Sequence, residues 1–246
     1  MAMHVAAALG MLRQRDVHAV EEMDRPGCDP ERLDRTYAQF SVVNRAVAGW
    51  RGIYRTHLRP VLSASRVTTL LDIGCGGGDV PVLLAAWAAR DRLKLEITAI
   101  DPDRRAFEFA RRRRRVGGVT FRQASTAELA AEGQRYDVVV SNHVLHHLGA
   151  SELPQFLAES ALLSRGSVLH NDIRRSPAAY ALFYAASWPF PGSFIRDDGL
   201  TSIRRSYTTA ELRAAAPPGW AVAPRLPFRN LLTLNQADLD RNARDD

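Results

Sequence analysis

The chain has 246 residues, of which 46% are hydrophobic and 24% charged, a composition typical of an ordinary soluble globular protein. This length predicts one large α/β domain with an added cap rather than two independent domains. Two cysteines, Cys28 and Cys75, exclude a disulfide framework and a cysteine metal cluster, and they favour a reducing cytoplasm. No stretch reaches the roughly 20 apolar residues that cross a bilayer, and Met1 to Leu12 lack the basic leader of a signal peptide.

The net charge of +6 raises the question of a nucleic-acid partner, but much of the excess comes from one run, Arg111 to Arg115. Lys94 is the only lysine, and this preference for arginine, with abundant alanine, is typical of a GC-rich genome. No nucleic-acid-binding module accompanies the run. We therefore interpret it as a solvated helix end and expect no nucleic-acid partner.

The first elements are predicted to be helical. Residues 1-28 carry little pattern and are expected to form a mobile tail, with a single domain over residues 29-246. Asp29-Pro30-Glu31 has the features of a helix start, namely a capping side chain, proline at the first helical position and an acid in the first turn. Apolar residues then recur at helical spacing, so we expect residues 29-64 to be a helical cover over the rest of the domain.

A strand, a glycine turn and a helix follow in direct succession. Val67 to Leu71 is β-branched or apolar throughout and predicts a buried parallel strand. The turn reads Asp72-Ile73-Gly74-Cys75-Gly76-Gly77-Gly78, and a helix begins near Asp79. Glycines let the backbone take positive φ and let a ligand approach the free amides at the helix start. We expect a pocket for a nucleotide-type ligand at this point.

The spacing of the glycines argues against a dinucleotide. In the Gly-x-Gly-x-x-Gly fingerprint the third glycine position is occupied here by Asp79. The carboxylate of Asp72 also suits a cationic ligand better than a pyrophosphate, which it would repel.

Further strands alternate with helices, and polar residues follow their ends. The second strand, 95–100, precedes Asp101-Pro102-Asp103; Asp101 stands 23 positions beyond Gly78, where a carboxylate binds ribose hydroxyls in Rossmann-like units. Strands over 119–121, 136–141 and 167–171 follow. They precede, in turn, Ser125-Thr126, the segment Asn142 to Leu148 with three histidines, and Asp172. Because ligands sit beyond the carboxyl ends of parallel strands, these residues should surround the pocket.

Residues 65-172 thus form the predicted cofactor-binding core, and residues 173-207 depart from the strand-helix alternation. Six aromatic residues between Tyr180 and Phe194 predict an inserted cap over the active site. In the C-terminal part, 208-246, a capping box at Thr208 opens a helix, and two strands, over 220–226 and 230–234, close the sheet.

The glycine turn resembles motif I of the class I S-adenosylmethionine-dependent methyltransferases. The segment Asn142 to Leu148 is similar to motif IV of their small-molecule members, the group that includes ubiquinone-biosynthesis and secondary-metabolite enzymes, and it lacks the form typical of DNA-base methyltransferases. The resemblance spans about Val67 to Asn235. It implies a doubly wound, Rossmann-like α/β fold: a seven-stranded, mostly parallel sheet with helices on both faces, a helical N-terminal cover and a cap after strand five.

The resemblance also implies S-adenosylmethionine as the cofactor and S-adenosylhomocysteine as the product. The cofactor-binding residues it implies are Asp72, Gly74, Cys75, Gly76, Gly78, Asp101, Pro102, Ser125, Thr126, Asn142 and His143. Ser125 stands where the family most often has an acid for the adenine amino group.

Some related O-methyltransferases place paired histidines and an acid near the acceptor, and the matching residues here are His146, His147 and Asp172. Histidine suits proton removal because its unperturbed pKa is about 6.5; a purely structural role at the strand-helix junction stays open. His143 and His147 could share a helix face, but without a His-Glu-x-x-His motif or a cysteine partner we expect no metal.

The sequence therefore favours methylation of a small, largely apolar acceptor, with a phenolic or enolic hydroxyl ahead of carbon. One alternative is C-methylation of a quinone precursor. Another is a non-catalytic protein that binds S-adenosylmethionine or a nucleotide.

Overall fold

A computed structural model describes residues 10, 12–113, 116–188 and 190–236 of the chain. Two residues of the arginine run, Arg114 and Arg115, and Pro189 of the predicted cap lie outside the described residues. None of the described helices combines the length and the apolar character that a bilayer crossing requires.

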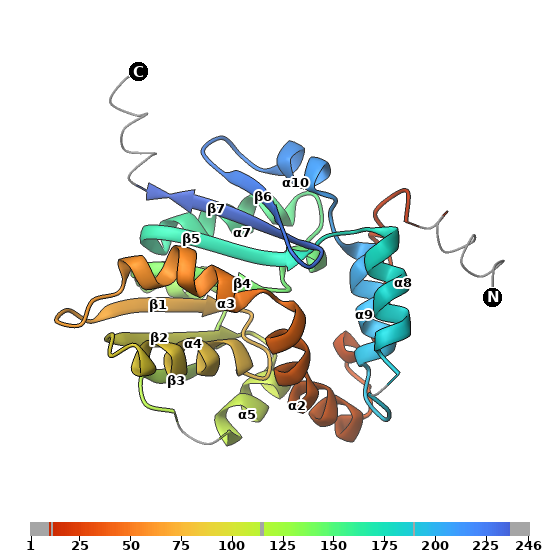
Figure 1. Cartoon of the computed structure of the whole chain (residues 1–246), viewed down its shortest axis with the longest axis horizontal. Helices are drawn as coiled ribbons and strands as arrows, with labels where there is room; N and C mark the ends of the chain where they lie inside the picture. Colours follow the sequence, from red (N-terminus) through yellow and green to blue (C-terminus); the bar gives the residue numbers. More distant parts are fainter. Residues whose placement is uncertain (1–9, 11, 114–115, 189, 237–246) are drawn as a thin grey trace.

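The centre of the molecule is one sheet of seven strands in the order β3-β2-β1-β4-β5-β7-β6 (Figure 1). The first five strands pair in parallel, and β7 runs antiparallel to β5 and β6. The predicted doubly wound, seven-stranded and mostly parallel sheet is confirmed. The strands are β1 (Thr68–Ile73), β2 (Leu95–Asp101), β3 (Val119–Gln123), β4 (Tyr136–Asn142), β5 (Ser164–Ile173), β6 (Ala221–Arg225) and β7 (Arg229–Asn235).

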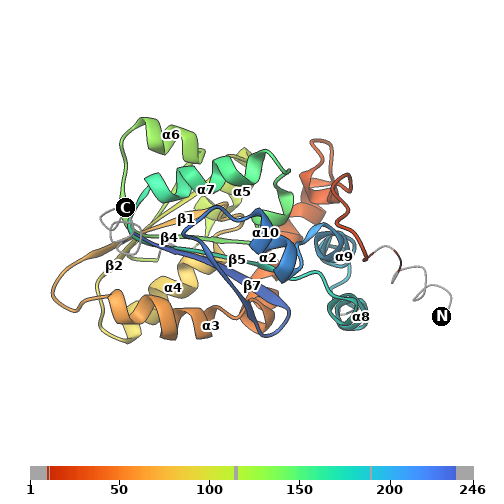
Figure 2. The same ribbon diagram turned by 90° about the horizontal axis from the view of Figure 1, so that it is seen from above.

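Helices cover both faces of this sheet, α3 and α4 on one and α6 and α7 on the other (Figure 2). Neighbouring residues of a strand point to opposite faces, so Leu70 packs with Leu84 of α4 and Leu71 with Leu157 of α7. The α-helices are α2 (Pro30–Val47), α3 (Trp50–Ile53), α4 (Asp79–Arg90), α5 (Arg104–Arg112), α6 (Thr126–Ala131), α7 (Glu152–Leu162), α8 (Pro177–Ala186), α9 (Ile195–Arg205) and α10 (Thr209–Ala215). Shorter helical turns are η1 (Glu22–Asp24), η2 (Tyr54–Leu58), η3 (Arg59–Val61) and η4 (Leu145–His147).

The helix starts predicted from the sequence are confirmed by their capping bonds. The Asp29 carboxylate accepts the amides of Glu31 (2.9 Å) and Arg32 (3.0 Å), with Pro30 at the first position of α2. Thr208 and Glu211 form the predicted capping box of α10.

Three helices lie beyond the carboxyl ends of the parallel strands. Figure 1 shows α8 and α9 side by side, with α2 next to them at the same edge of the sheet. Between β5 and α10 the chain thus forms a helical pair in place of a simple connection. This is where the site is built.

Residues 12–28 differ from the expectation of a mobile tail over residues 1-28. Leu12 is buried with Ile203 of α9, and the Arg15 guanidinium donates to the carbonyls of His146 (2.8 Å) and Leu148 (2.7 Å). Specific polar contacts hold residues 12–28 in place. Because these residues have no periodic apolar pattern, the sequence did not indicate an ordered segment. Residues 1–9 and 11 lie outside the described residues.

Candidate active site

A cavity of about 680 Å³ opens at the carboxyl ends of β1, β2 and β4, beneath helices α2, α8 and α9. This volume is within the range of small-molecule and cofactor sites. Its walls include ten of the eleven predicted cofactor-binding residues, all except Gly78, and both predicted catalytic histidines.

The glycine turn forms one wall of the cavity. Gly74 and Gly76 have φ of 67° and 52°, a region that side chains rarely adopt, and the Gly76 amide donates to Asp101 (2.8 Å). Gly78 serves packing instead, because a Cβ there would lie 2.6 Å from the ring of Phe121. Cys75 is buried, and burial raises the pKa of its thiol well above the ordinary value.

Asp72, on β1, is a buried carboxylate at the cavity wall, and neither of its oxygens has a hydrogen-bond partner. Burial raises its pKa well above the ordinary value, and the nearby charges of Asp79 and Asp101 raise it further. An unsatisfied buried carboxylate next to other acids favours a cationic ligand group.

Asp101 and its neighbours form the next part of the wall. The Asp101 carboxylate accepts from the amides of Gly76 and Asp103 (2.9 Å), so its position is fixed at the end of β2. Ser125 caps α6 and exchanges bonds with Glu128, whereas the Thr126 hydroxyl donates to Glu159. Pro102, Ser125 and Thr126 line the cavity.

At the end of β4, Asn142 and His143 are held by Arg229 of β7, a residue that the sequence did not suggest. Asn142 Oδ1 accepts from Trp50 (3.0 Å) and from Arg229 (3.0 Å). His143 adopts φ of 62°, and its ring contacts the Arg229 guanidinium. Burial lowers the pKa of His143 well below the ordinary value, and Arg229 lowers it further, so this ring is neutral.

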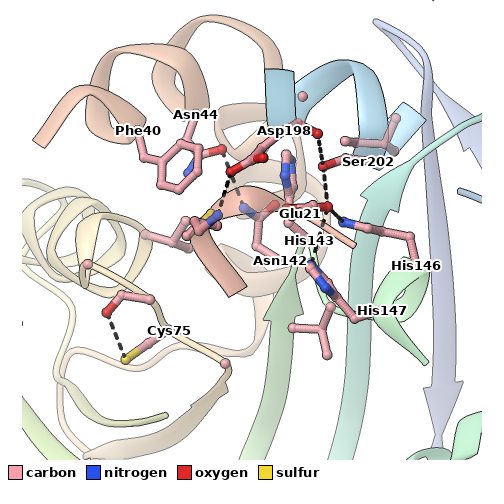
Figure 3. A pocket seen from close by; sticks show the side chains of 18 of the residues that line it. Glu21, Phe40, Asn44, Cys75, Asn142, His143, His146, His147, Asp198 and Ser202 are labelled. Atoms are coloured by element: carbon pink, nitrogen blue, oxygen red, sulfur yellow. Dashed lines mark hydrogen bonds and ion pairs between the residues drawn. The ribbon is translucent and has the colours of Figure 1, made fainter. Parts of the chain in front are cut away.

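The two other histidines converge on Glu21 (Figure 3). His146 Nδ1 donates to Asp172 (2.7 Å), and its Nε2 lies 3.3 Å from Glu21 Oε1. His147 Nε2 lies 3.8 Å from the same oxygen, and its Nδ1 lies 3.2 Å from Asp24. Of the three predicted catalytic residues, Asp172 does not line the cavity; it lies behind His146 and positions it.

The charges of this cluster are strongly coupled. Burial disfavours the charged form of His146, but Asp172 and Glu21 outweigh it and raise its pKa to about 9. Burial would likewise raise the pKa of Glu21, whereas His147 and His146 lower it to about 2. Glu21 is thus an ionised carboxylate in a buried position, held also by the Ser202 hydroxyl (2.7 Å).

Sequence reasoning missed Glu21 because it lies in the segment expected to be a tail. Asp198 of α9 fixes that segment, since its carboxylate accepts the amides of Glu22 (2.7 Å) and Met23 (3.0 Å). No local pattern around Glu21 signals this contact; it arises only when α9 is folded next to η1.

The aromatic residues of the predicted cap differ in their environments. Phe183 of α8 lines the cavity, whereas Phe194 is buried among Leu33 and Tyr37 outside it. Trp188 is 72% exposed, under the guanidinium of Arg196. Trp188 and Phe194 therefore do not line the cavity, whereas Phe183 does.

The similarity of this chain to known proteins includes the residues that form the core of this site. Residues 70–165 match the family model described as a methyltransferase domain. A ubiquinone biosynthesis O-methyltransferase from Roseobacter denitrificans is 34% identical over 116 residues, which is 46% of this chain and 44% of that protein. A ribosomal protein L11 methyltransferase from Ruminiclostridium cellulolyticum is 29% identical over 42% of this chain and 33% of its own length. The chain thus spans less than half the length of these curated relatives.

Solved structures share the fold over more of the chain. An O-methyltransferase family protein from Burkholderia thailandensis aligns with a TM-score of 0.59 and 18% identity, covering 94% of this chain and 68% of its own. The plantazolicin methyltransferase BpumL, solved with a pentazolic desmethylPZN analog and S-adenosylhomocysteine, aligns with a TM-score of 0.52 and 14% identity over 84% of this chain and 97% of its own.

The fold is therefore that of the class I methyltransferases, as the sequence resemblance implied. The match to the methyltransferase-domain model, residues 70–165, covers less than half of the chain.

Proposed function

We propose that the protein is a methyltransferase that uses S-adenosylmethionine to methylate a hydroxyl group, phenolic or enolic, of a small and largely apolar acceptor. The observation that carries the proposal is one cavity with two chemically different walls. The glycine turn with Asp72 and Asp101 forms one, and Glu21 with His146 and His147 forms the other.

The residues of the first wall fit the cofactor. The unpartnered carboxyl of Asp72 would accept from an ammonium group, whose positive charge would favour the ionised form of Asp72, and Asp101 keeps lone pairs for ribose hydroxyls. Gly76 leaves its side open for close approach of a ligand, with no neighbouring atom nearer than 3.9 Å to the Cβ position. When bound, S-adenosylmethionine supplies an electrophilic methyl group on a sulfonium.

The second wall fits a hydroxyl acceptor in an apolar environment. Methyl transfer needs the acceptor oxygen in line with the methyl group in a dry site, and it is faster from an ionised oxygen. Leu182 and Phe183 of α8 and Ile195 of α9 give the cavity apolar sides. Glu21, His146 and His147 are the polar groups placed to orient and ionise the hydroxyl, with Asp172 holding His146.

The matched relatives support methyl transfer in general and O-methylation loosely. Their similarity falls on the cofactor-binding half, and they include both a ubiquinone biosynthesis enzyme and a ribosomal protein methyltransferase. The acceptor preference proposed here rests on the cavity. We also propose a cytoplasmic location and a small molecule, not a nucleic acid, as the partner.

Two measurements on the full chain test the proposal. Calorimetry should show binding of S-adenosylmethionine and S-adenosylhomocysteine and no comparable binding of NAD. Turnover to S-adenosylhomocysteine should then depend on a phenolic acceptor and be lost with the matching methyl ether. Cofactor binding without turnover on any hydroxyl would favour the non-catalytic alternative, and methylation of ring carbon would favour the quinone-precursor alternative.

A further inference from the structure

Glu21, His146 and His147 present one ligand atom each to the same point of the cavity wall. Their three nearest nitrogen and oxygen atoms all lie within 4.8 Å of one another. The residues come from two distant parts of the chain: Glu21 directly precedes η1, and the two histidines lie in η4. Glu21 and His146 are buried, whereas His147 is partly exposed toward the cavity.

The Nδ1 atoms of both histidines, which are not the atoms nearest to Glu21, pair with other carboxylates. His146 Nδ1 pairs with Asp172 (2.7 Å) and His147 Nδ1 with Asp24 (3.2 Å). Histidines that bind metals almost always direct the second ring nitrogen to a carboxylate or carbonyl in this way, because the bond fixes the tautomer and the ring orientation. Both Nε2 atoms therefore face Glu21.

The distances from Glu21 Oε1 to the two Nε2 atoms are longer than those of good hydrogen bonds. His146 Nε2 is buried and makes no hydrogen bond, although it lies 3.3 Å from Glu21 Oε1. Two ligands held at ~2.1 Å from a tetrahedral cation are ~3.4 Å apart. The spacings of 3.3 Å and 3.8 Å from Glu21 Oε1 to the two Nε2 atoms are close to that value.

Charge around the cluster favours a cation. The carboxylates of Glu21, Asp24 and Asp172 contact the two rings. The guanidinium groups of Arg15 and Arg205 donate to the backbone carbonyls of His146 and His147, and that of Arg205 lies 3.9 Å from Asp24. Ser202 donates to Glu21 Oε1 and holds the carboxylate in place.

We propose that Glu21, His146 and His147 bind one divalent transition-metal cation, with zinc as the ion that this His₂-carboxylate set matches, and with the fourth position open to the cavity. From the sequence no metal is expected, because His143 and His147 lack a carboxylate or cysteine partner in a metal-binding motif. In the structure His143 contacts Arg229 instead, and Glu21 supplies the third ligand. If the proposed function holds, the open position would take the acceptor hydroxyl and lower its pKa.

The test uses the tag-free full chain, stripped with a chelator and titrated with Co²⁺ as a spectroscopic probe. We expect saturable binding of one equivalent, with visible d–d absorption that Zn²⁺ abolishes by displacement. Glu21→Gln and His147→Ala should each weaken binding by more than the roughly 10–100-fold that loss of an outer carboxylate costs, and Asp24→Asn should fall in that range. The matched control Glu22→Gln, whose exposed side chain pairs with Arg25, should bind as the parent does.

Absence of one-equivalent binding in the parent would overturn the metal site, as would equal affinity in Glu21→Gln and Glu22→Gln. Should the buried Glu21 variant fail to fold, His147→Ala and Asp24→Asn alter partly exposed side chains and still decide the question. No cofactor or acceptor is present in the titration. A negative result therefore leaves methyl transfer untouched, and metal binding without methyl transfer would reject only the proposed function.

Discussion

The carboxylate of Asp172 accepts two hydrogen bonds of 2.7 Å from His146, one from its ring Nδ1 and one from its backbone amide. Both residues are buried, and this pairing fixes the His146 ring in η4. Asp172 thus acts on the cavity through His146 and does not reach it. Burial would raise the pKa of Asp172, but the charge of His146 holds it far below the ordinary value.

Removing this carboxylate should destabilise the fold. Asp172→Asn leaves the buried His146 ring without its anionic partner, and breaking a buried pair in this way typically costs about 3–5 kcal/mol. Urea unfolding measures the loss, with Asp197→Asn, an exposed acid of α9, as the control. Equal unfolding free energies for the two variants would show that the pair contributes nothing.

Asp72, in contrast to Asp172, should lower the free energy of unfolding when its carboxyl is ionised. Because its pKa is raised in the folded state, the fold favours the protonated form, and that stability is lost as pH rises through the raised pKa. The free energy of unfolding of Asp72→Asn, relative to the parent, should therefore increase between about pH 4 and about pH 7. Urea titrations at both pH values measure this. A difference that is constant with pH would contradict the unpaired, buried state of Asp72.

Asp101 should control affinity for the cofactor. If its carboxylate accepts both ribose hydroxyls, Asp101→Asn weakens charge-assisted bonds worth ~1.5–3 kcal/mol each, and affinity for S-adenosylmethionine should fall roughly tenfold or more. Glu96→Gln, an exposed acid on the same strand, is the control. Calorimetry with both variants is the measurement, and unchanged affinity in Asp101→Asn would remove Asp101 from the cofactor site.

The cap offers a test of which aromatic residues meet the acceptor. Phe183→Ala should raise the acceptor KM and spare cofactor affinity, because the ring lines the cavity. Trp188→Ala should change neither constant, and Phe194→Ala should lower stability by about 3–5 kcal/mol because it empties a core position. Steady-state kinetics and melting temperatures separate these outcomes. If Trp188→Ala raises the acceptor KM and Phe183→Ala does not, the acceptor does not bind against Phe183 in the cavity.

Most of the sheet and one wall of the cavity could be predicted because their signals are local. An uncharged strand such as Val67 to Leu71, a glycine turn after it and an acid such as Asp101 after the next strand are each visible within a few residues. Parallel topology then brings the strand ends together without further information. The same logic placed Asn142, His143 and the two following histidines near the cavity.

The rest depends on contacts between distant segments. Glu21 reaches His146 only because Asp198 of α9 holds the amides after it, and nothing near Glu21 in the sequence records that pairing. Helical spacing suggested that His143 and His147 share a face, yet the chain forms only the short turn η4 after a residue with positive φ. Aromatic spacing likewise could not separate Phe183 at the cavity from Phe194 in the core.

The most direct test of methyl transfer to a hydroxyl follows the methyl group itself. The full chain is incubated with S-adenosylmethionine carrying an isotopically labelled methyl group and a panel of apolar phenols, and the products are analysed by mass spectrometry and nuclear magnetic resonance. The proposal predicts labelled methyl ethers formed in step with S-adenosylhomocysteine. Label on carbon or nitrogen, or no label transferred from bound cofactor to any phenol, would contradict it.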